Sequence, residues 1–111
     1  MKHPIELKQK NLSISEPLEQ DIRSRVERLD RFCDRIHRCT VTLEGPGAHH
    51  RHGLHSVQID LAVPGKEIVV NRHENVNLLL ALKDAFDAAT RVLEEHVRVT
   101  RGFVKAHANP Q

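Results

Sequence analysis

Four arginines recur at steps of three and four residues, the spacing that keeps side chains on one face of an α-helix. They are Arg28, Arg31, Arg35 and Arg38, the last of which joins the row only if the helix extends that far. A guanidinium group presents a planar fork of N–H donors that fits phosphate oxygens in pairs. Acidic neighbours such as Glu27 give a second interpretation, a solvated face with weak ion pairs. The sequence alone leaves both interpretations open.

A second group that could bind ions is a cluster of histidines around Arg51. His49, His50, His52 and His55 fall within seven residues, and the chain has nine histidines in all. Neutral imidazole binds zinc, copper or nickel, but structural zinc sites usually add cysteines or distant ligands, so we expect no specific metal. Because histidine titrates near pH ~6.5, the segment would become cationic on mild acidification and contact phosphate. A solvated loop is the third interpretation.

Catalysis finds no support in the residues. The sequence contains no glycine-rich phosphate loop and no G-x-S-x-G motif. Cys33 and Cys39 both occupy positions in the apolar pattern, which predicts buried hydrophobic side chains rather than nucleophiles. The carboxylates fall on predicted solvated helix faces, where they lack the burial or the crowding of like charges that acid–base catalysis requires. We therefore expect neither an enzyme nor a cofactor.

The length and composition describe one small globular domain. The 111 residues are 39% hydrophobic and 29% charged, which excludes a disordered chain. Seventeen Lys and Arg against 15 Asp and Glu give a net charge of +2, which excludes a strongly basic tail but allows a locally basic face. We expect a domain over residues 1–102 and a short flexible tail over 103–111. Without a secretory signal or an apolar run of membrane-spanning length, we expect a cytoplasmic monomer or weak homodimer.

These groups must be positioned by an α+β fold in the order β-α-β-β-β-α. Apolar periodicity predicts strands at about 4–10, 38–44, 56–63 and 67–72, and helices at about 16–36 and 76–100. Each helix has one apolar stripe, which in the first helix includes Phe32, so both helices should pack on one face of a four-stranded sheet. The other face is predicted to be polar and without aromatic side chains; its residues are Glu6, Lys8, Lys10, Arg38, Thr40, Thr42, Gln58, Asp60, Glu67, Val69 and Asn71. Any RNA partner would then be recognised by its backbone, without base stacking.

The last helix has mixed charges. Asp87–Arg91 and Glu94–Arg98 are expected i,i+4 pairs. Arg98, Arg101 and Lys105 cluster near its end, where cations also suit the helix dipole and where Gly102 is the expected residue after the C-cap. Stabilisation of the end of the helix is a sufficient explanation for these three cations, without an RNA partner.

Several short motifs together resemble one known family. They are Ile14-Ser15-Glu16-Pro17-Leu18, Arg28-Leu29, Asp34-Arg35-Ile36, Val63-Pro64-Gly65, and Ala81-Leu82 with Asp87, Arg91 and Leu93. In order and spacing they are similar to the ribosome hibernation-promoting factor and ribosome-associated inhibitor family, also called sigma-54 modulation or ribosomal subunit interface proteins. The likeness covers about residues 5–101. The chain departs from the pattern at Asn77, Leu79 and Lys83, where the family has Asp, Tyr and Asp, and at Ala88, Glu95 and Val97, where it has lysines.

The resemblance implies a fold, a partner and a function. Members of the family share a β-α-β-β-β-α fold related to double-stranded-RNA-binding domains. They bind the small ribosomal subunit in the channel used by messenger and transfer RNA, and they silence translation in resting cells. The same is implied for this chain, as a short form without the C-terminal dimerisation domain of long members. No membrane and no small-molecule substrate are implied.

From the residues and the resemblance together we predict two sets of contacts. The RNA-binding set is Arg28, Arg31, Arg35, Arg38, Lys8, Lys10, Arg91, Arg98, Arg101 and Lys105. The set of pH-dependent phosphate contacts is His49, His50, Arg51, His52 and His55. The alternatives are a protein-interaction module that uses Leu79 and Val69 and has lost ribosome binding, and a metal binder built on the histidine segment.

Overall fold

The chain folds into four strands and two helices in the order predicted from the sequence. The computed structural model describes residues 5–33, 35–46 and 53–108, and the side chains of these up to residue 100. The elements are β1 (Ile5–Lys10), α1 (Glu16–Leu29), β2 (Arg38–Glu44), β3 (His55–Val63), β4 (Lys66–Asn75) and α2 (Leu78–Ala108). The predicted α+β class is confirmed.

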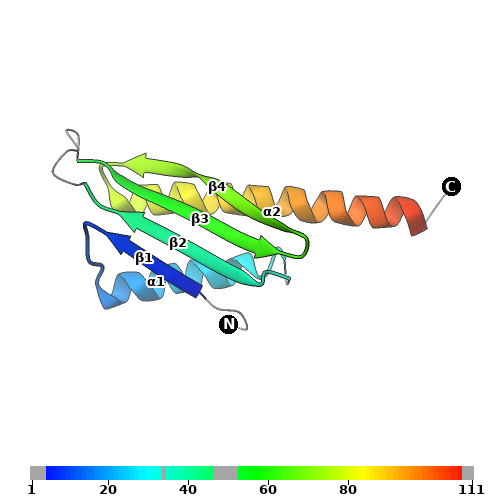
Figure 1. The fold of residues 1–111 in the computed structure, drawn as a ribbon, viewed down its shortest axis with the longest axis horizontal. Helices are drawn as coiled ribbons and strands as arrows, with labels where there is room; N and C mark the ends of the chain where they lie inside the picture. The colour runs from blue at the N-terminus through cyan, green and yellow to red at the C-terminus, as the bar shows by residue number, and fades with distance from the viewer. Residues whose placement is uncertain (1–4, 34, 47–52, 109–111) are drawn as a thin grey trace.

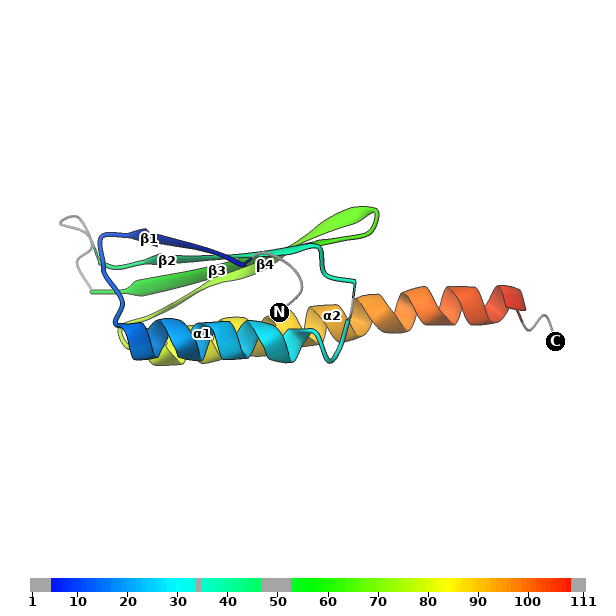
Figure 2. The ribbon, with the colours of Figure 1, turned by 90° about the horizontal axis from the view of Figure 1, so that it is seen from below.

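The strands form one sheet that is covered on one face only. Their order is β1-β2-β3-β4, with β1 parallel to β2 and the other neighbours antiparallel. Both helices lie against the same face (Figures 1 and 2), as predicted. The opposite face is open and displays every second residue of each strand.

The core lies between the sheet and the helices. Alternate residues of β3, from Val57 to Val63, are buried, and α1 contributes Ile22, Val26 and Leu29. Each buried Leu or Ile side chain stabilises the fold by about 1.5–3 kcal/mol. The apolar periodicity therefore predicted correctly which face of the sheet packs against the helices.

Helix α1 begins where the sequence predicted and ends earlier. The Ser15 side chain caps the helix by accepting a hydrogen bond from the Leu18 N–H at 3.3 Å. The helix stops at Leu29, seven residues before the predicted end at 36. Its 14 residues span ~21 Å, about the length of β2, whereas a helix to residue 36 would overshoot the strand that it must lead into. Cys33 and Ile36 continue the apolar pattern because the connection itself packs them into the core.

Helix α2 is longer than predicted. It runs to Ala108 and projects beyond the sheet (Figure 2), so the molecule measures 59 × 27 × 20 Å. Gly102 lies inside the helix, and its prediction as the residue after the C-cap is wrong. A single glycine costs a helix only about 1 kcal/mol relative to alanine, so one glycine does not by itself end a helix. Neither described helix is long and apolar enough to cross a membrane.

Strand β4 contains an irregularity that the sequence did not reveal. Val57 pairs with His73 and Ile59 with Val70, so β4 has one extra residue at this point, a β-bulge. The strand continues to Asn75, beyond the predicted end at 72. The bulge breaks the alternation of apolar and polar residues, which is why the pattern ended early. Its consequence is that Arg72 joins the open face of the sheet.

Candidate nucleic-acid interface

The four arginines of the predicted row lie on four successive segments of chain. Arg28 is in the last turn of α1, Arg31 is in the turn that follows, Arg35 is in the connection, and Arg38 is the first residue of β2. All four are exposed. The prediction that they line one edge of a helix is wrong, because the helix ends at Leu29. We call these four residues the arginine group.

The arginine group differs from the other arginines of α1 in its partners. Arg23 bonds to Glu19 at 3.0 Å and Arg25 to Asp21 at 2.9 Å, both at i,i+4 spacing. No member of the arginine group forms an ion pair or side-chain hydrogen bond with any residue that the structure describes. The interpretation of a face with weak ion pairs therefore applies to Arg23 and Arg25. The arginine group keeps its guanidinium donors available to a partner.

One aromatic side chain lies beside these arginines. Phe32 belongs to the apolar pattern that predicts burial, yet it is 37% exposed. Phe32 follows the end of α1, and the connection there packs Cys33 and Ile36 into the core while Phe32 is left at the surface. The expectation that Phe32 packs in the core is therefore corrected.

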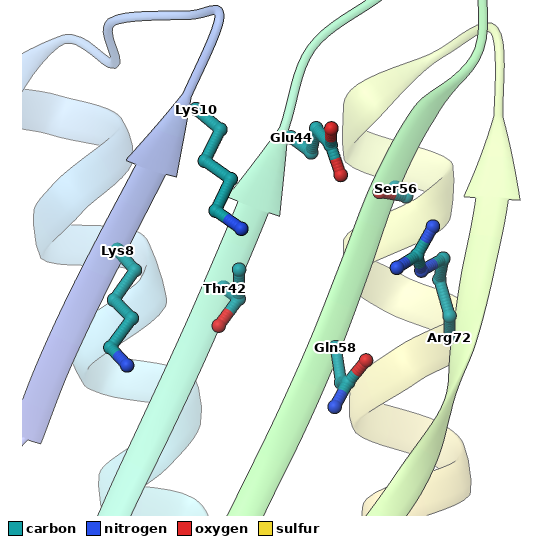
Figure 3. Close-up of a pocket in the computed structure, with 7 residues that line it drawn as sticks. All are labelled: Lys8, Lys10, Thr42, Glu44, Ser56, Gln58 and Arg72. Atoms are coloured by element: carbon teal, nitrogen blue, oxygen red, sulfur yellow. The ribbon is translucent and has the colours of Figure 1, made fainter.

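A second basic region is a hollow of about 250 Å³ on the open face of the sheet. The strand register arranges its lining in two rows across the sheet: Lys8, Thr42 and Gln58 in one, and Lys10, Glu44 and Ser56 in the other, with Arg72 from β4 completing it. In Figure 3, Lys10 and Arg72 extend from the outer strands toward the two central strands. The outward orientation predicted for Lys8, Lys10, Thr42 and Gln58 is confirmed.

Three lining residues were missing from the predicted face. Arg72 was not predicted to lie on the open face because the bulge in β4 shifts the alternation of the strand at this point. Glu44 and Ser56 stand at the ends of their strands, and extending the alternation by one step from Thr42 and from Gln58 would have found both.

The polar groups of the hollow are only partly satisfied. Lys8, Lys10 and Arg72 face one lining carboxylate, that of Glu44, and none of these four groups forms an ion pair within the described part of the chain. Ser56 is 4% exposed. The Gln58 amide nitrogen donates to Asp60 at 3.3 Å, which turns its oxygen toward Arg72 (Figure 3).

The open face is polarised along the strands. Beyond the hollow, Glu6, Thr40 and Asp60 form the next row, and Arg38 and Glu67 belong to the last one. Acidic residues thus dominate the end of the face that is distant from the hollow. Glu74, opposite Ser56, is the additional carboxylate at the edge of the hollow.

The cations of α2 have other partners than the sequence predicted. Asp87 bonds to Lys83 at 3.2 Å and not to Arg91, and Arg98 bonds to Glu95 and not to Glu94. Spacings of three and four residues both allow contact on a helix, so the alternative carboxylates were within reach. Arg91 is exposed. Arg101 and Lys105 belong to the stretch of α2 whose side chains lie outside the description.

Of the histidines predicted to contact phosphate, the structure describes His55. His55 begins β3, and its Nδ1 lies 3.0 Å from the Val76 carbonyl oxygen, so the ring contacts the connection between β4 and α2. The predicted contacts His49, His50, Arg51 and His52 lie outside the described residues. Across residues 5–33, 35–46 and 53–100, no group of three or more metal-ligating side chains comes together.

The two cysteines are buried, as predicted, and neither forms a disulfide. Burial, together with smaller contributions from the nearby carboxylates of Asp60 and Asp30, raises the pKa of the Cys39 thiol from 9.0 to about 12. The thiol is therefore protonated at neutral pH, which suits a packing role and not a nucleophile.

The fold and these surfaces describe an α+β domain with exposed cations that lack partners among the described residues. The chain belongs to the family described as Sigma 54 modulation protein / S30EA ribosomal protein, whose model matches residues 5–101. It is 29% identical over 93 residues to a ribosome hibernation promotion factor of Deinococcus radiodurans. That match covers 84% of this chain and 46% of the relative, so the chain spans about half the length of the curated relative it matches.

Solved structures share the fold. The N-terminal domain of Thermus thermophilus Protein Y has a TM-score of 0.68 and 22% identity, over 82% of this chain and 94% of that domain. A ribosomal subunit interface protein from Coxiella burnetii has a TM-score of 0.72 and 14% identity, over 84% of this chain and 96% of that one. At these identities the likeness is one of fold alone.

Proposed function

We propose that this chain is a ribosome hibernation factor of the translation-inhibitor type. It binds the small ribosomal subunit in the cytoplasm through phosphates of ribosomal RNA, and it occludes the channel of messenger and transfer RNA. Membership of the family and the name of the Deinococcus relative support this assignment. The chain acts by steric exclusion and without a cofactor.

The observation that carries the proposal is the arginine group. Its four guanidinium groups are exposed and form no ion pair with a described residue, whereas Arg23 and Arg25 are bound to carboxylates. A guanidinium group that is unpaired in the free protein loses no internal ion pair when it binds phosphate. Arginine binds phosphate in two-pronged hydrogen bonds, each stronger than a hydrogen bond between neutral groups.

A matched pair of variants tests this role. Arg28→Gln with Arg35→Gln removes two charges from the arginine group, and Arg23→Gln with Arg25→Gln removes two that are already paired. In gradient co-sedimentation with purified small subunits, the first variant should lose at least about tenfold in affinity, the cost of two charge-assisted contacts. The second should stay within about twofold of the wild type, since surface pairs contribute little. Equal losses would remove the arginine group from the interface.

Occlusion has its own test. Small subunits loaded with messenger RNA and initiator transfer RNA before the chain is added should bind it much more weakly than empty subunits. Equal binding to loaded and empty subunits would contradict a position in the channel while leaving ribosome binding intact.

A protein-interaction module is the second candidate, favoured by exposed apolar side chains. Val69 is 58% exposed and Leu79 is 55% exposed, and Val76 and Leu80 extend the apolar surface at the start of α2. Val69 lies on the open sheet face, whereas Leu79 lies on α2 in the other layer, so the two residues do not form one surface. Sedimentation analysis separates the candidates, because a tight dimer that ignores ribosomes would favour this one.

A further inference from the structure

We propose that the hollow on the open sheet face is a subsite for the ribose–phosphate backbone of RNA, and that it distinguishes RNA from DNA. The inference rests on the proposed function, since it assigns a second surface of the chain to the same partner. It adds a chemical selectivity that the arginine group alone does not provide.

The walls of the hollow supply the charge that a phosphate needs. Lys10 on β1 and Arg72 on β4 extend inward over the two central strands from opposite sides (Figure 3). Neither has an ion-pair partner among the residues that the structure describes. Lys8 adds a third cation one row further along. Cations on both sides of a hollow can hold one phosphate or two successive ones along a strand of nucleic acid.

The floor of the hollow contains a buried polar group, the Ser56 hydroxyl. Ser56 is 4% exposed, and its hydroxyl forms no hydrogen bond with any other described residue. Buried polar groups in folded proteins are nearly always hydrogen-bonded, to the protein, to water or to a ligand. The Ser56 hydroxyl lines the hollow beside Glu44 and Gln58, so a ligand in the hollow can supply the missing bond.

The acceptors on the floor select the kind of ligand. The Glu44 carboxylate and the Gln58 side-chain oxygen lie at the centre of the hollow, where a ligand would contact them. Both are hydrogen-bond acceptors, so a ligand that fits them carries a hydrogen-bond donor. A phosphodiester group or the carboxylate of an acidic peptide can bind the cations of the walls but offers no donor to these two oxygens. The ribose 2′-hydroxyl is both donor and acceptor, and it is the group that separates RNA from DNA. None of the residues that line the hollow is aromatic, so base stacking plays no part.

The test compares one RNA hairpin with the DNA hairpin of the same sequence, by fluorescence anisotropy with the whole chain. The wild type should bind the RNA at least about fivefold more tightly, the value of one or two hydrogen bonds. Ser56→Ala should reduce this ratio to about twofold or less by the same reasoning. The matched control is Thr40→Val, which removes another buried hydroxyl from the same face outside the hollow.

Variants of the walls should behave differently from variants of the floor. Lys10→Gln or Arg72→Gln should weaken RNA and DNA binding alike and reduce the salt slope by about one. Lys83→Gln, on α2 and paired with Asp87, should change neither. Ribose 5-phosphate, added as a competitor, should displace the RNA hairpin only at concentrations far above those of the hairpin itself.

The inference and the proposed function can fail separately. Equal affinity of the wild type for the two hairpins, absence of hairpin binding, or equal effects of Ser56→Ala and Thr40→Val would overturn the ribose subsite. Tight competition by ribose 5-phosphate would assign the hollow to a free sugar phosphate and overturn it as well. Failure of the wild type to sediment with small subunits, with RNA preference intact, would contradict the ribosomal function and leave the subsite standing.

Discussion

The hollow and the arginine group are both basic, but the chain builds them in different ways. The hollow draws on four strands, and the register of the sheet fixes which residues meet across it. The arginine group comes from eleven consecutive residues that pass from the end of α1 into β2, with only the first and last of its members on regular elements. A sheet holds side chains in fixed relative positions, whereas a connection holds them less strictly. We therefore assign selectivity to the hollow and most of the salt-dependent affinity to the arginine group.

The largest expected effect comes from a substitution that lies next to the hollow and away from the arginine group. A Cβ at Gly45 would lie 2.6 Å from the Asn11 carbonyl oxygen, and the Gly45 N–H already bonds to the Lys10 carbonyl at 2.8 Å. Gly45→Ala should lower the free energy of unfolding by about 1–3 kcal/mol, because the backbone beside Lys10 must move. Urea unfolding measures this, and hairpin binding should show a reduced preference for RNA.

The same variant sharpens the contrast between the two regions. Small-subunit affinity of folded Gly45→Ala should fall less than that of the Arg28→Gln and Arg35→Gln variant. Gly65→Ala is the matched control, since it strains a positive φ of 81° in the β3–β4 hairpin, where the added Cβ meets open space. If both glycine variants lose RNA preference equally, the hollow has no special role.

The next effect concerns Cys39, which follows Arg38 in β2 and lies beneath the end of the sheet that the arginine group borders. Well below pH 9.0 the thiol is neutral in both the folded and the unfolded chain. As the pH rises toward about 12, the unfolded chain loses the proton and the folded chain keeps it, so stability falls. The loss should reach about 2 kcal/mol near pH ~10.5, measured by urea unfolding from pH ~8 upward. Cys39→Ala should lack this alkaline decline; a decline of the same size in the variant would assign it to other groups.

The smallest effect tests whether the start of α1 matters to either region. Ser15→Ala removes the helix cap at the end of α1 distant from Arg28. The free energy of unfolding should fall by about 1 kcal/mol. Both RNA preference and small-subunit affinity should remain at the wild-type level when measured well below the unfolding temperature. A change in either would mean that α1 transmits strain to a binding region.

Much of the fold followed from local patterns, and the errors have physical causes. Alternation predicted the strands, and the apolar stripes predicted that both helices share one face of the sheet. The end of α1 was missed because Cys33 and Ile36 keep the helical period while they pack from a non-helical connection. The bulge in β4 depends on pairing with β3, and pairing is a property of the folded sheet that a single strand does not encode.

The candidate site was predictable to a smaller extent. Lys8, Lys10, Thr42 and Gln58 were placed on the open face by their alternation alone. Arg72 was not, because its orientation depends on the bulge, and the alignment of the arginine group was wrong because it depended on the length of α1. Residue type and spacing thus identified the basic residues, and the tertiary structure decided which of them lie together.

Recognition of RNA phosphates by the arginine group should be visible in the salt dependence of binding to purified small ribosomal subunits. Each phosphate neutralised contributes about −0.7 to −0.9 to the slope of log affinity against log salt, so the four members of the arginine group predict a slope of about −3 or steeper. Replacing Arg28 and Arg35 by Gln should reduce the magnitude of that slope by about 1.5 on the same basis. A slope near zero, or a slope that the two substitutions leave unchanged, would contradict recognition of ribosomal RNA phosphates by these arginines.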